Sequence, residues 1–141
     1  MIKDNIIEIQ GKKINCLLDI LKFFENITPC QKLFGYTNLF DEDNMNLNRF
    51  NDVLGTLYGE IEKSTDKRPI IIRWFNYKHS KKALSYSETI KFIKWEFPLC
   101  HPTYHEQLNN EMALALKNQG STIFEEVLEI IKNNDFVVEL L

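Results

Sequence analysis

One run of large apolar residues, at positions 70–75, constrains the fold of this chain more than any other feature. It reads Ile-Ile-Ile-Arg-Trp-Phe and directly follows Pro69. β-Branched and aromatic residues favour strands, and a nearly continuous apolar run is typical of a strand that is covered on both faces. The run therefore predicts a buried strand of a parallel sheet, whose neighbours must be reached through long crossover connections.

Strand-like segments also lie near the two ends of the chain. Residues 5–10 are rich in isoleucine and are followed by Gly11, and residues 136–141 are apolar at five of six positions. Short β-branched runs that end at a glycine or a turn are typical of strands. The sequence therefore predicts three strands.

Two long helices are predicted between the first and second strands. Apolar residues recur at helical spacing from Asn15, the expected N-cap, to Pro29, and again from about 46 to 62. Gly55 and Gly59 weaken the second helix, which is therefore open to a break into two. Its buried stripe is expected to comprise Leu47, Phe50, Leu54, Leu57, Tyr58 and Ile61.

Three capping boxes follow the second strand. In such a box a Ser or Thr precedes a Glu by three residues, and the two side chains bond reciprocally to free backbone N–H groups of a helix's first turn. Three helices are therefore expected to start at these boxes. The pairs are Ser85 with Glu88, Thr103 with Glu106, and Thr122 with Glu125.

Strands thus alternate with helices, and every connection is long enough for a crossover. This order predicts an α/β fold with a small three-stranded parallel sheet packed with helices. The chain has 141 residues, of which 44% are hydrophobic, so it can bury an ordinary core without disulfides or a metal. We expect a single domain over residues 1–141.

Cysteine usage and the first residues indicate the compartment. Cys16, Cys30 and Cys100 are an odd number without a C-x-x-C pair, which is typical of a reducing environment, and we expect all three to be small buried side chains. Residues 1–9 carry charges where a signal peptide needs an apolar run. No stretch resembles a membrane helix. The sequence therefore predicts a cytoplasmic protein without membrane association.

The sequence contains no G-x-G-x-x-G, P-loop, G-x-S-x-G, H-E-x-x-H or C-x-x-C motif. The one cluster with metal-like residues contains Cys100, His101 and His105. Pro102 and the capping box at Thr103 place the two histidines in different elements, so we expect a polar turn rather than a metal site. A nucleophile–base pair between Cys100 and a histidine has no activating context. We therefore predict no catalytic residues, no metal and no cofactor, and a protein that is not an enzyme.

Charge is segregated along the chain. The formal net charge is −3, which argues against nucleic-acid binding by bulk charge. Residues 41–62 contain six acids and one base, residues 67–105 eight bases and two acids, and residues 106–141 seven acids and two bases. Solvated helix faces explain many charge runs. The net charge nevertheless hides two acidic blocks and one basic block.

The first acidic block has features of a binding surface. Asp41, Glu42 and Asp43 end a predicted loop at 30–46, and the following helix carries short polar residues that do not favour helix interiors. Short carboxylates and amides meet Arg, Lys and His side chains with little loss of rotamer entropy. This pattern indicates a surface selected for recognition.

The same helix carries the main part of a family resemblance. Residues 46–54, NLNRFNDVL, are similar to the motif N-L-D-x-L-x-D-x-L of barstar-like ribonuclease inhibitors. Residues 9–14, residues 69–74 and residues 120–140 resemble that family's first strand and turn, its proline-initiated second strand, and its last helix and strand. These segments occur along the chain in the family's order.

The resemblance implies a function. Barstar-like proteins plug a nuclease's active site with the second helix and the loop before it, so that acids occupy the places of the RNA phosphates. It implies an immunity protein or antitoxin whose partner is a cognate nuclease toxin, with contact-dependent growth inhibition as one setting and ribonuclease as the expected activity. The implied partner-binding residues are Asp41, Glu42, Asp43, Asn46, Asn48, Asn51, Asp52, Thr56 and Glu129.

Within this set Asp52 corresponds to the family's central inhibitory acid. Asn48 stands where the family has an acid, and Asn51 stands where its type member has an aromatic residue. These departures imply a cognate nuclease different from the partner of the type member.

The segment at about 83–118 has no counterpart in the family and is interpreted as an inserted helical segment. Aromatic residues alternate with lysines between 78 and 97, a pattern that allows an alternative function as an RNA-binding module. The same pattern also fits an amphipathic helix that buries its aromatic residues against its own domain.

Overall fold

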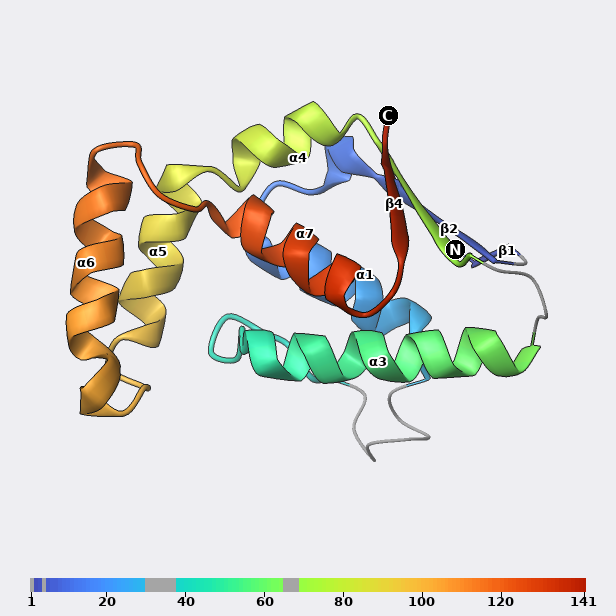
Figure 1. Ribbon diagram of the computed structural model, residues 1–141, viewed down its shortest axis with the longest axis horizontal. Helices are drawn as coiled ribbons and strands as arrows, with labels where there is room; N and C mark the ends of the chain where they lie inside the picture. The colour runs from blue at the N-terminus through green and yellow to red at the C-terminus, as the bar shows by residue number, and fades with distance from the viewer. Residues whose placement is uncertain (1, 4, 30–37, 65–68) are drawn as a thin grey trace.

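The computed structural model describes residues 2–3, 5–29, 38–64 and 69–141 and has an α/β fold (Figure 1). Within these residues the strands form one sheet in the order β1 (Ile2–Lys3), β2 (Ile6–Gln10), β3 (Ile71–Phe75) and β4 (Val137–Leu140). β2, β3 and β4 are parallel, which confirms the predicted three-stranded parallel sheet. The short β1 pairs antiparallel with β2 and was not predicted.

The sheet is fully covered on one face only. Helices lie on one side of it (Figure 1), and the side chains of Ile7, Ile9, Ile72 and Trp74 on that face are completely buried. The opposite face is half-exposed and contains an ion pair across neighbouring strands, between Arg73 Nε and a Glu139 carboxylate oxygen 2.9 Å away. The prediction that residues 70–75 are covered on both faces is therefore wrong. On the open face the apolar residues of β3 are only half-buried, and this partial burial is sufficient for them to lie in the strand.

Helices supply the rest of the structure. The α-helices are α1 (Leu17–Ile27), α3 (Leu47–Ser64), α4 (Tyr77–Ala83), α5 (Tyr86–Glu96), α6 (His105–Leu116) and α7 (Ile123–Asn133), and the 3-10 turns are η1 (Gly11–Lys13) and η2 (Pro102–Tyr104). The predicted helices at 15–29 and 46–62 correspond to α1 and α3. The predicted loop at 30–46 falls partly outside the described residues, and Cys30 lies outside them.

α3 is one continuous helix. It spans eighteen residues without a break at Gly55 or Gly59. Five of its side chains are buried on one face, and each contributes about 1.5–3 kcal/mol, whereas a helical glycine costs about 1 kcal/mol. Tertiary packing therefore outweighs the low propensity of the two glycines. The buried residues are Phe50, Val53, Leu54, Leu57 and Ile61.

One of the three predicted capping boxes is present. Thr122 Oγ1 accepts the Glu125 N–H at 3.3 Å, and the Glu125 carboxylate accepts the Thr122 N–H at 3.1 Å. Ser85 is the N-cap of α5 but its side chain makes no capping bond. Thr103 lies inside η2, whose cap is His101. The predicted capping boxes at Ser85 and Thr103 are therefore wrong.

Long-range contacts replace the local caps. The carboxylate of Glu88 accepts the N–H of Leu17 at 2.7 Å and so caps α1 from α5. Cys16, not Asn15, is the N-cap residue of α1, and the Asn15 side-chain oxygen lies 2.7 Å from Nε2 of His79. Glu88 and Leu17 are 71 residues apart in the sequence, so no short sequence motif predicts this hydrogen bond.

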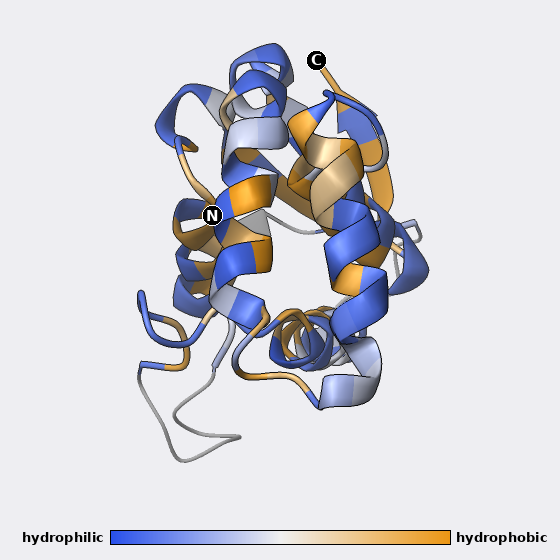
Figure 2. Cartoon of the chain, turned by 90° about the vertical axis from the view of Figure 1, so that its left-hand side faces the viewer, coloured by the Kyte–Doolittle hydropathy of each residue, from blue (hydrophilic) through white to orange (hydrophobic). Residues whose placement is uncertain are grey.

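α5 and α6 form a helical pair at one end of the molecule (Figure 1), within the predicted insertion at 83–118. Leu108 and Ala115 of α6 are buried but lie outside the main core cluster, whereas Phe92 of α5 belongs to it. Figure 2 faces this pair and shows hydrophilic residues interspersed with hydrophobic ones along both helices, with α3 nearly end-on below them. α5 therefore joins the core to an outer helix.

We predict that Gly11→Ala lowers the free energy of unfolding by about 2–3 kcal/mol, because overpacking against rigid backbone forces it to move. A β-carbon at Gly11 would lie 2.3 Å from the carbonyl oxygen of Phe75. Urea denaturation measures the effect. Gly59→Ala is the matched control: a β-carbon there has no atom within 4 Å, so this change is expected to stabilise the helix by about 0.5–1 kcal/mol. Equal effects of the two substitutions would contradict the prediction.

Candidate partner-binding site

The acidic triplet forms a tight turn before α3. Asp41 and Asn44 exchange two backbone hydrogen bonds, of 3.2 and 3.0 Å, and the Asp41 side chain accepts the N–H of Asp43 at 2.9 Å. Asp41, Glu42 and Asp43 are all exposed. The turn therefore presents three carboxylates to solvent on an ordered backbone.

A buried glutamate holds the chain just before this turn. Glu25 of α1 is 4% exposed, and its carboxylate accepts the N–H groups of Leu39 and Phe40 and a bond from Lys22 Nζ at 2.9 Å. Leu39 and Phe40 are themselves buried in the core. Charge-assisted hydrogen bonds and apolar packing thus hold the segment just before the acidic turn against α1.

The predicted site residues at the start of α3 have different roles. The Asn46 side-chain oxygen accepts the N–H groups of Asn48 and Arg49, at 2.8 and 3.1 Å, and therefore caps the helix. Asn48 and Asp52 are exposed and lie one helical turn apart. Asn46 orders the helix N-terminus, while the other two side chains face solvent.

α7 lies beside the first half of α3. The Asn51 side-chain oxygen accepts a hydrogen bond of 2.8 Å from the side chain of Asn134, which follows α7. Thr56 is half-buried on α3, and Glu129 is exposed on α7. The structure therefore uses Asn51 to join two helices, a role that the sequence did not suggest.

The exposed acids of this region have no internal counter-charge. Among the described residues, the carboxylates of Asp41, Glu42, Asp43 and Asp52 take part in no ion pair. An exposed ion pair contributes little to stability, so unpaired surface acids cost the fold little. They remain available for a basic partner.

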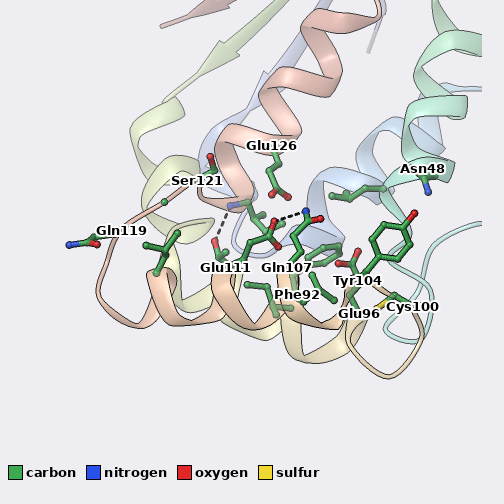
Figure 3. A pocket seen from close by; sticks show the side chains of 17 residues that line it. Asn48, Phe92, Glu96, Cys100, Tyr104, Gln107, Glu111, Gln119, Ser121 and Glu126 are labelled. Carbon is green, nitrogen blue, oxygen red and sulfur yellow. Dashed lines mark hydrogen bonds between the residues drawn. The ribbon is translucent and has the colours of Figure 1, made fainter. Parts of the chain in front are cut away.

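A cavity of about 700 Å³ opens beside the N-terminus of α3. Its walls come from α3, α5, α6, α7 and the segment before α7, and Figure 3 shows glutamates of three helices around it. Apolar side chains form much of the remaining wall. The lining residues are Leu47, Asn48, Thr89, Phe92, Ile93, Glu96, Cys100, Tyr104, Gln107, Leu108, Glu111, Leu114, Gln119, Gly120, Ser121, Ile123 and Glu126.

The glutamates of this cavity disfavour one another's charge. Burial raises the pKa of Glu126 to about 7, and the carboxylates of Glu111, Glu96 and Glu129 add to this effect. Burial, with a contribution from Glu111, also raises the pKa of Glu96. Gln107 Nε2 donates to the Glu111 carboxylate at 3.3 Å. No Lys, Arg or His is among the described lining residues, so the negative charge of the cavity is uncompensated.

We predict that Glu126→Gln stabilises the protein at pH 8 and has little effect at pH 4.5. The raised pKa means that the folded state holds a proton which the unfolded state releases as the pH rises above about 4.5. The contribution of Glu126 to wild-type stability therefore falls between about pH 4.5 and about pH 7, and a neutral amide removes this loss. We expect a gain of about 1–2 kcal/mol at pH 8, after allowance for solvent exposure.

Urea denaturation at the two pH values measures this effect. Glu106→Gln is the control, because Glu106 is exposed on α6 and lies outside the cavity lining. A gain in stability at pH 4.5 equal to that at pH 8 would contradict the assignment.

The basic, aromatic segment at 78–97 is mainly packed inward. Phe92 and Ile93 are buried, Trp95 packs against the core, and Phe97 stacks on the ring of His105 with centroids 3.9 Å apart. This packing agrees with the interpretation of an amphipathic helix. The exposed side chains of the segment include Lys78, Lys81, Lys82, Lys91 and Lys94. RNA binding stays an untested alternative and, at Phe92, lacks the exposed ring that base stacking requires.

The Cys100–His105 cluster bonds mainly to backbone and to itself. Cys100 Sγ and His105 Nε2 lie 3.4 and 3.1 Å from the carbonyl oxygen of Phe97, and His101 Nδ1 lies 3.0 Å from Thr103 Oγ1. In the part of the chain that the structure describes, no three potential ligands are grouped to hold a metal ion. Cys16 and Cys100 are half-buried free thiols, less buried than expected.

Sequence reasoning did not identify the glutamates of the cavity. Glu111 and Glu126 belong to the C-terminal acidic block, but Glu96 lies in the basic block. Each is on a different helix, and no spacing rule links them. The acidic block was the only signal, and it covers seven acids without distinguishing these two.

Comparison with protein families, with curated proteins and with solved structures finds no match for this chain. Among the described residues, no helix combines the length and the apolar character that crossing a membrane requires.

Proposed function

We propose that this chain is an inhibitor of the immunity or antitoxin class, which binds a cognate nuclease and blocks its active site. The acidic turn Asp41–Asp43 and the first half of α3 form its binding surface. The observation that carries the proposal is the set of exposed carboxylates on an ordered turn and helix, without an ion-pair partner among the described residues.

The chemistry of nucleases explains why such a surface blocks them. RNA and DNA are held through their phosphates by Arg, Lys and backbone N–H groups. A carboxylate at the place of a phosphate accepts the same charge-assisted hydrogen bonds. Asp41, Glu42, Asp43 and Asp52 supply such acceptors, and Arg49 is the only base in the block 41–62.

Pre-organisation supports the proposal. The Asp41–Asn44 hydrogen bonds, the Asn46 cap and the Glu25 anchor order the backbone before any partner arrives. Ordering a loop on binding costs free energy, and a surface that is already ordered avoids this cost. The net charge of the block also accelerates encounter with a basic partner at low salt.

The resemblance to barstar-like inhibitors points in the same direction. It implies a three-stranded parallel sheet with an inhibitory helix, and α3 carries Asp52 at the position of the family's central acid. In this proposal the chain acts in the cytoplasm, where a nuclease toxin meets RNA. The partner is the nuclease domain, and no cofactor is required.

The candidate nuclease for a direct test is the C-terminal domain of the protein encoded next to this chain. We expect that domain to stop growth when it is expressed alone, to degrade RNA in vitro, and to be inhibited by one equivalent of this chain. A neighbouring domain without nuclease activity, or an active nuclease that this chain leaves uninhibited, would overturn the proposal.

A further inference from the structure

The cavity between α3, α5, α6 and α7 adjoins the proposed binding surface. Leu47 and Asn48 of α3 belong to its lining, and Asn48 is also one of the implied partner-binding residues. A protein bound over the first half of α3 therefore lies next to this cavity.

The cavity has the size and wall chemistry of a binding site. Its volume of about 700 Å³ is within the range of about 300–1,000 Å³ that is usual for ligand sites. Phe92, Ile93, Leu108 and Ile123, all buried, contribute apolar wall. Apolar wall of this kind suits an aliphatic stem.

The polar part of the cavity accepts positive charge. Glu96, Glu111 and Glu126 come from α5, α6 and α7, and none of them is in an ion pair within the described part of the chain. Burial, and after it the negative charges of Glu111, Glu96 and Glu129, raise the pKa of Glu126, and a bound cation relieves the repulsion between these carboxylates. Among the described residues no three potential ligands are grouped to hold a metal ion, whereas an organic cation suits a wall that is partly carboxylate and partly apolar.

We propose that this cavity receives an arginine side chain of the bound nuclease. The inference rests on the proposed function and adds a second contact to the same interface. Arginine combines an apolar stem with a planar guanidinium whose five N–H donors match carboxylates. Phe92 and Leu108 contact the apolar stem, and the carboxylates of Glu111 and Glu126 accept hydrogen bonds from the guanidinium.

A capped amino acid tests the chemistry of the cavity. The probe is N-acetyl-arginine methylamide, with the citrulline analogue as its neutral counterpart, and binding is followed by NMR of the 15N-labelled protein. We expect the arginine probe to shift the amide signals of Gln107, Glu111 and Glu126 at pH 8, and the citrulline probe to leave them unchanged. Equal shifts from both probes, or none from arginine, would overturn the proposal.

The pH dependence of probe binding has a defined sign. Protonation of Glu126 removes one of the charges that attract the guanidinium, while Glu111, Glu96 and Glu129 face it from α6, α5 and α7. We therefore expect weaker binding at pH 5.5 than at pH 8. Binding that strengthens on acidification would contradict the role of these carboxylates.

Two substitutions on one helix give a matched pair. Glu111 lines the cavity, whereas Glu106, also on α6, is exposed and does not line it. Glu111→Gln is expected to weaken probe binding about tenfold, and Glu106→Gln to change it less than about twofold, because loss of a charge-assisted hydrogen bond is costly. Equal affinities of the two variants for the probe would show that Glu111 does not bind the guanidinium.

Inhibition of the nuclease separates this inference from the proposed function. Glu111→Gln is expected to weaken nuclease binding by about the same factor as probe binding. Unchanged nuclease affinity in this variant, with weakened probe binding, would show that no arginine of the partner enters the cavity. Absence of nuclease inhibition by the wild type, with probe binding intact, would overturn the proposed function and would leave the cavity as an arginine-binding site without a nuclease partner.

Discussion

Replacement of Glu25 by alanine is expected to lower the free energy of unfolding by about 3 kcal/mol. Glu25 is 4% exposed, and its carboxylate accepts the N–H groups of Leu39 and Phe40. Alanine leaves these donors without an acceptor at a buried position, and each unmet donor costs about 1–3 kcal/mol. Lys22 also loses its partner, but it is partly exposed and its loss adds little.

Urea denaturation measures this effect, and two variants test its cause. Glu25→Gln keeps one side-chain oxygen as an acceptor for both N–H groups, so we expect it to lose less stability than Glu25→Ala. Lys22→Ala should cost less than about 1 kcal/mol, because its ion pair is partly solvated. A loss below about 1 kcal/mol for Glu25→Ala would mean that the buried hydrogen bonds are replaced by water.

The same substitution connects stability with function. Glu25 orders the segment that leads into Asp41, and the turn that follows is the exposed part of the proposed interface. When this segment is less ordered in the free protein, the turn must become ordered as the nuclease binds, and this ordering costs free energy. We therefore expect Glu25→Ala to weaken nuclease binding although Glu25 itself is buried.

Removal of the exposed acids is expected to have the largest effect on nuclease binding. Asp52→Ala should weaken the complex at least about 30-fold, which corresponds to about 2 kcal/mol and is typical of a central interface residue. The triple variant Asp41→Asn, Glu42→Gln and Asp43→Asn should mainly slow association, because it reduces the charge that steers encounter. Asn at position 41 retains an oxygen that can accept the bond from the Asp43 backbone.

Association and dissociation rates at low and high salt distinguish these two effects. We expect the association rate of the triple variant to depend less on salt than that of the wild type. Glu8→Gln is the control, because Glu8 is exposed on β2, away from α3. Unchanged affinity in both Asp52→Ala and the triple variant would show that the nuclease binds elsewhere.

Local patterns predicted the elements of the fold well. The isoleucine-rich run at 70–75 became β3, and the stripe of α3 is buried largely as its spacing predicts, with Leu47 and Tyr58 partly buried against the core. These patterns succeed because side-chain direction follows directly from strand or helix geometry. The capping box at Thr122 succeeds for the same reason, since its partners are three residues apart.

Predictions that depended on packing were less successful. The apolar run in β3 indicated two covered faces, but the second face is half-exposed and contains the ion pair of Arg73 with the distant Glu139. The capping box predicted at Ser85 does not form, because the Glu88 carboxylate accepts the N–H of Leu17 at the start of α1 instead. In each case a residue distant in the sequence decided the environment.

The sequence by itself determined the three parallel strands, most of the helices and the acidic block, because each depends on residues within a few positions of one another. Only the tertiary structure decided that Glu96, Glu111 and Glu126 share a cavity beside α3. They lie on three helices, one of them in a basic stretch, and nothing local links them. Burial and mutual repulsion, which raise the pKa of Glu126, arise only when the helices pack together.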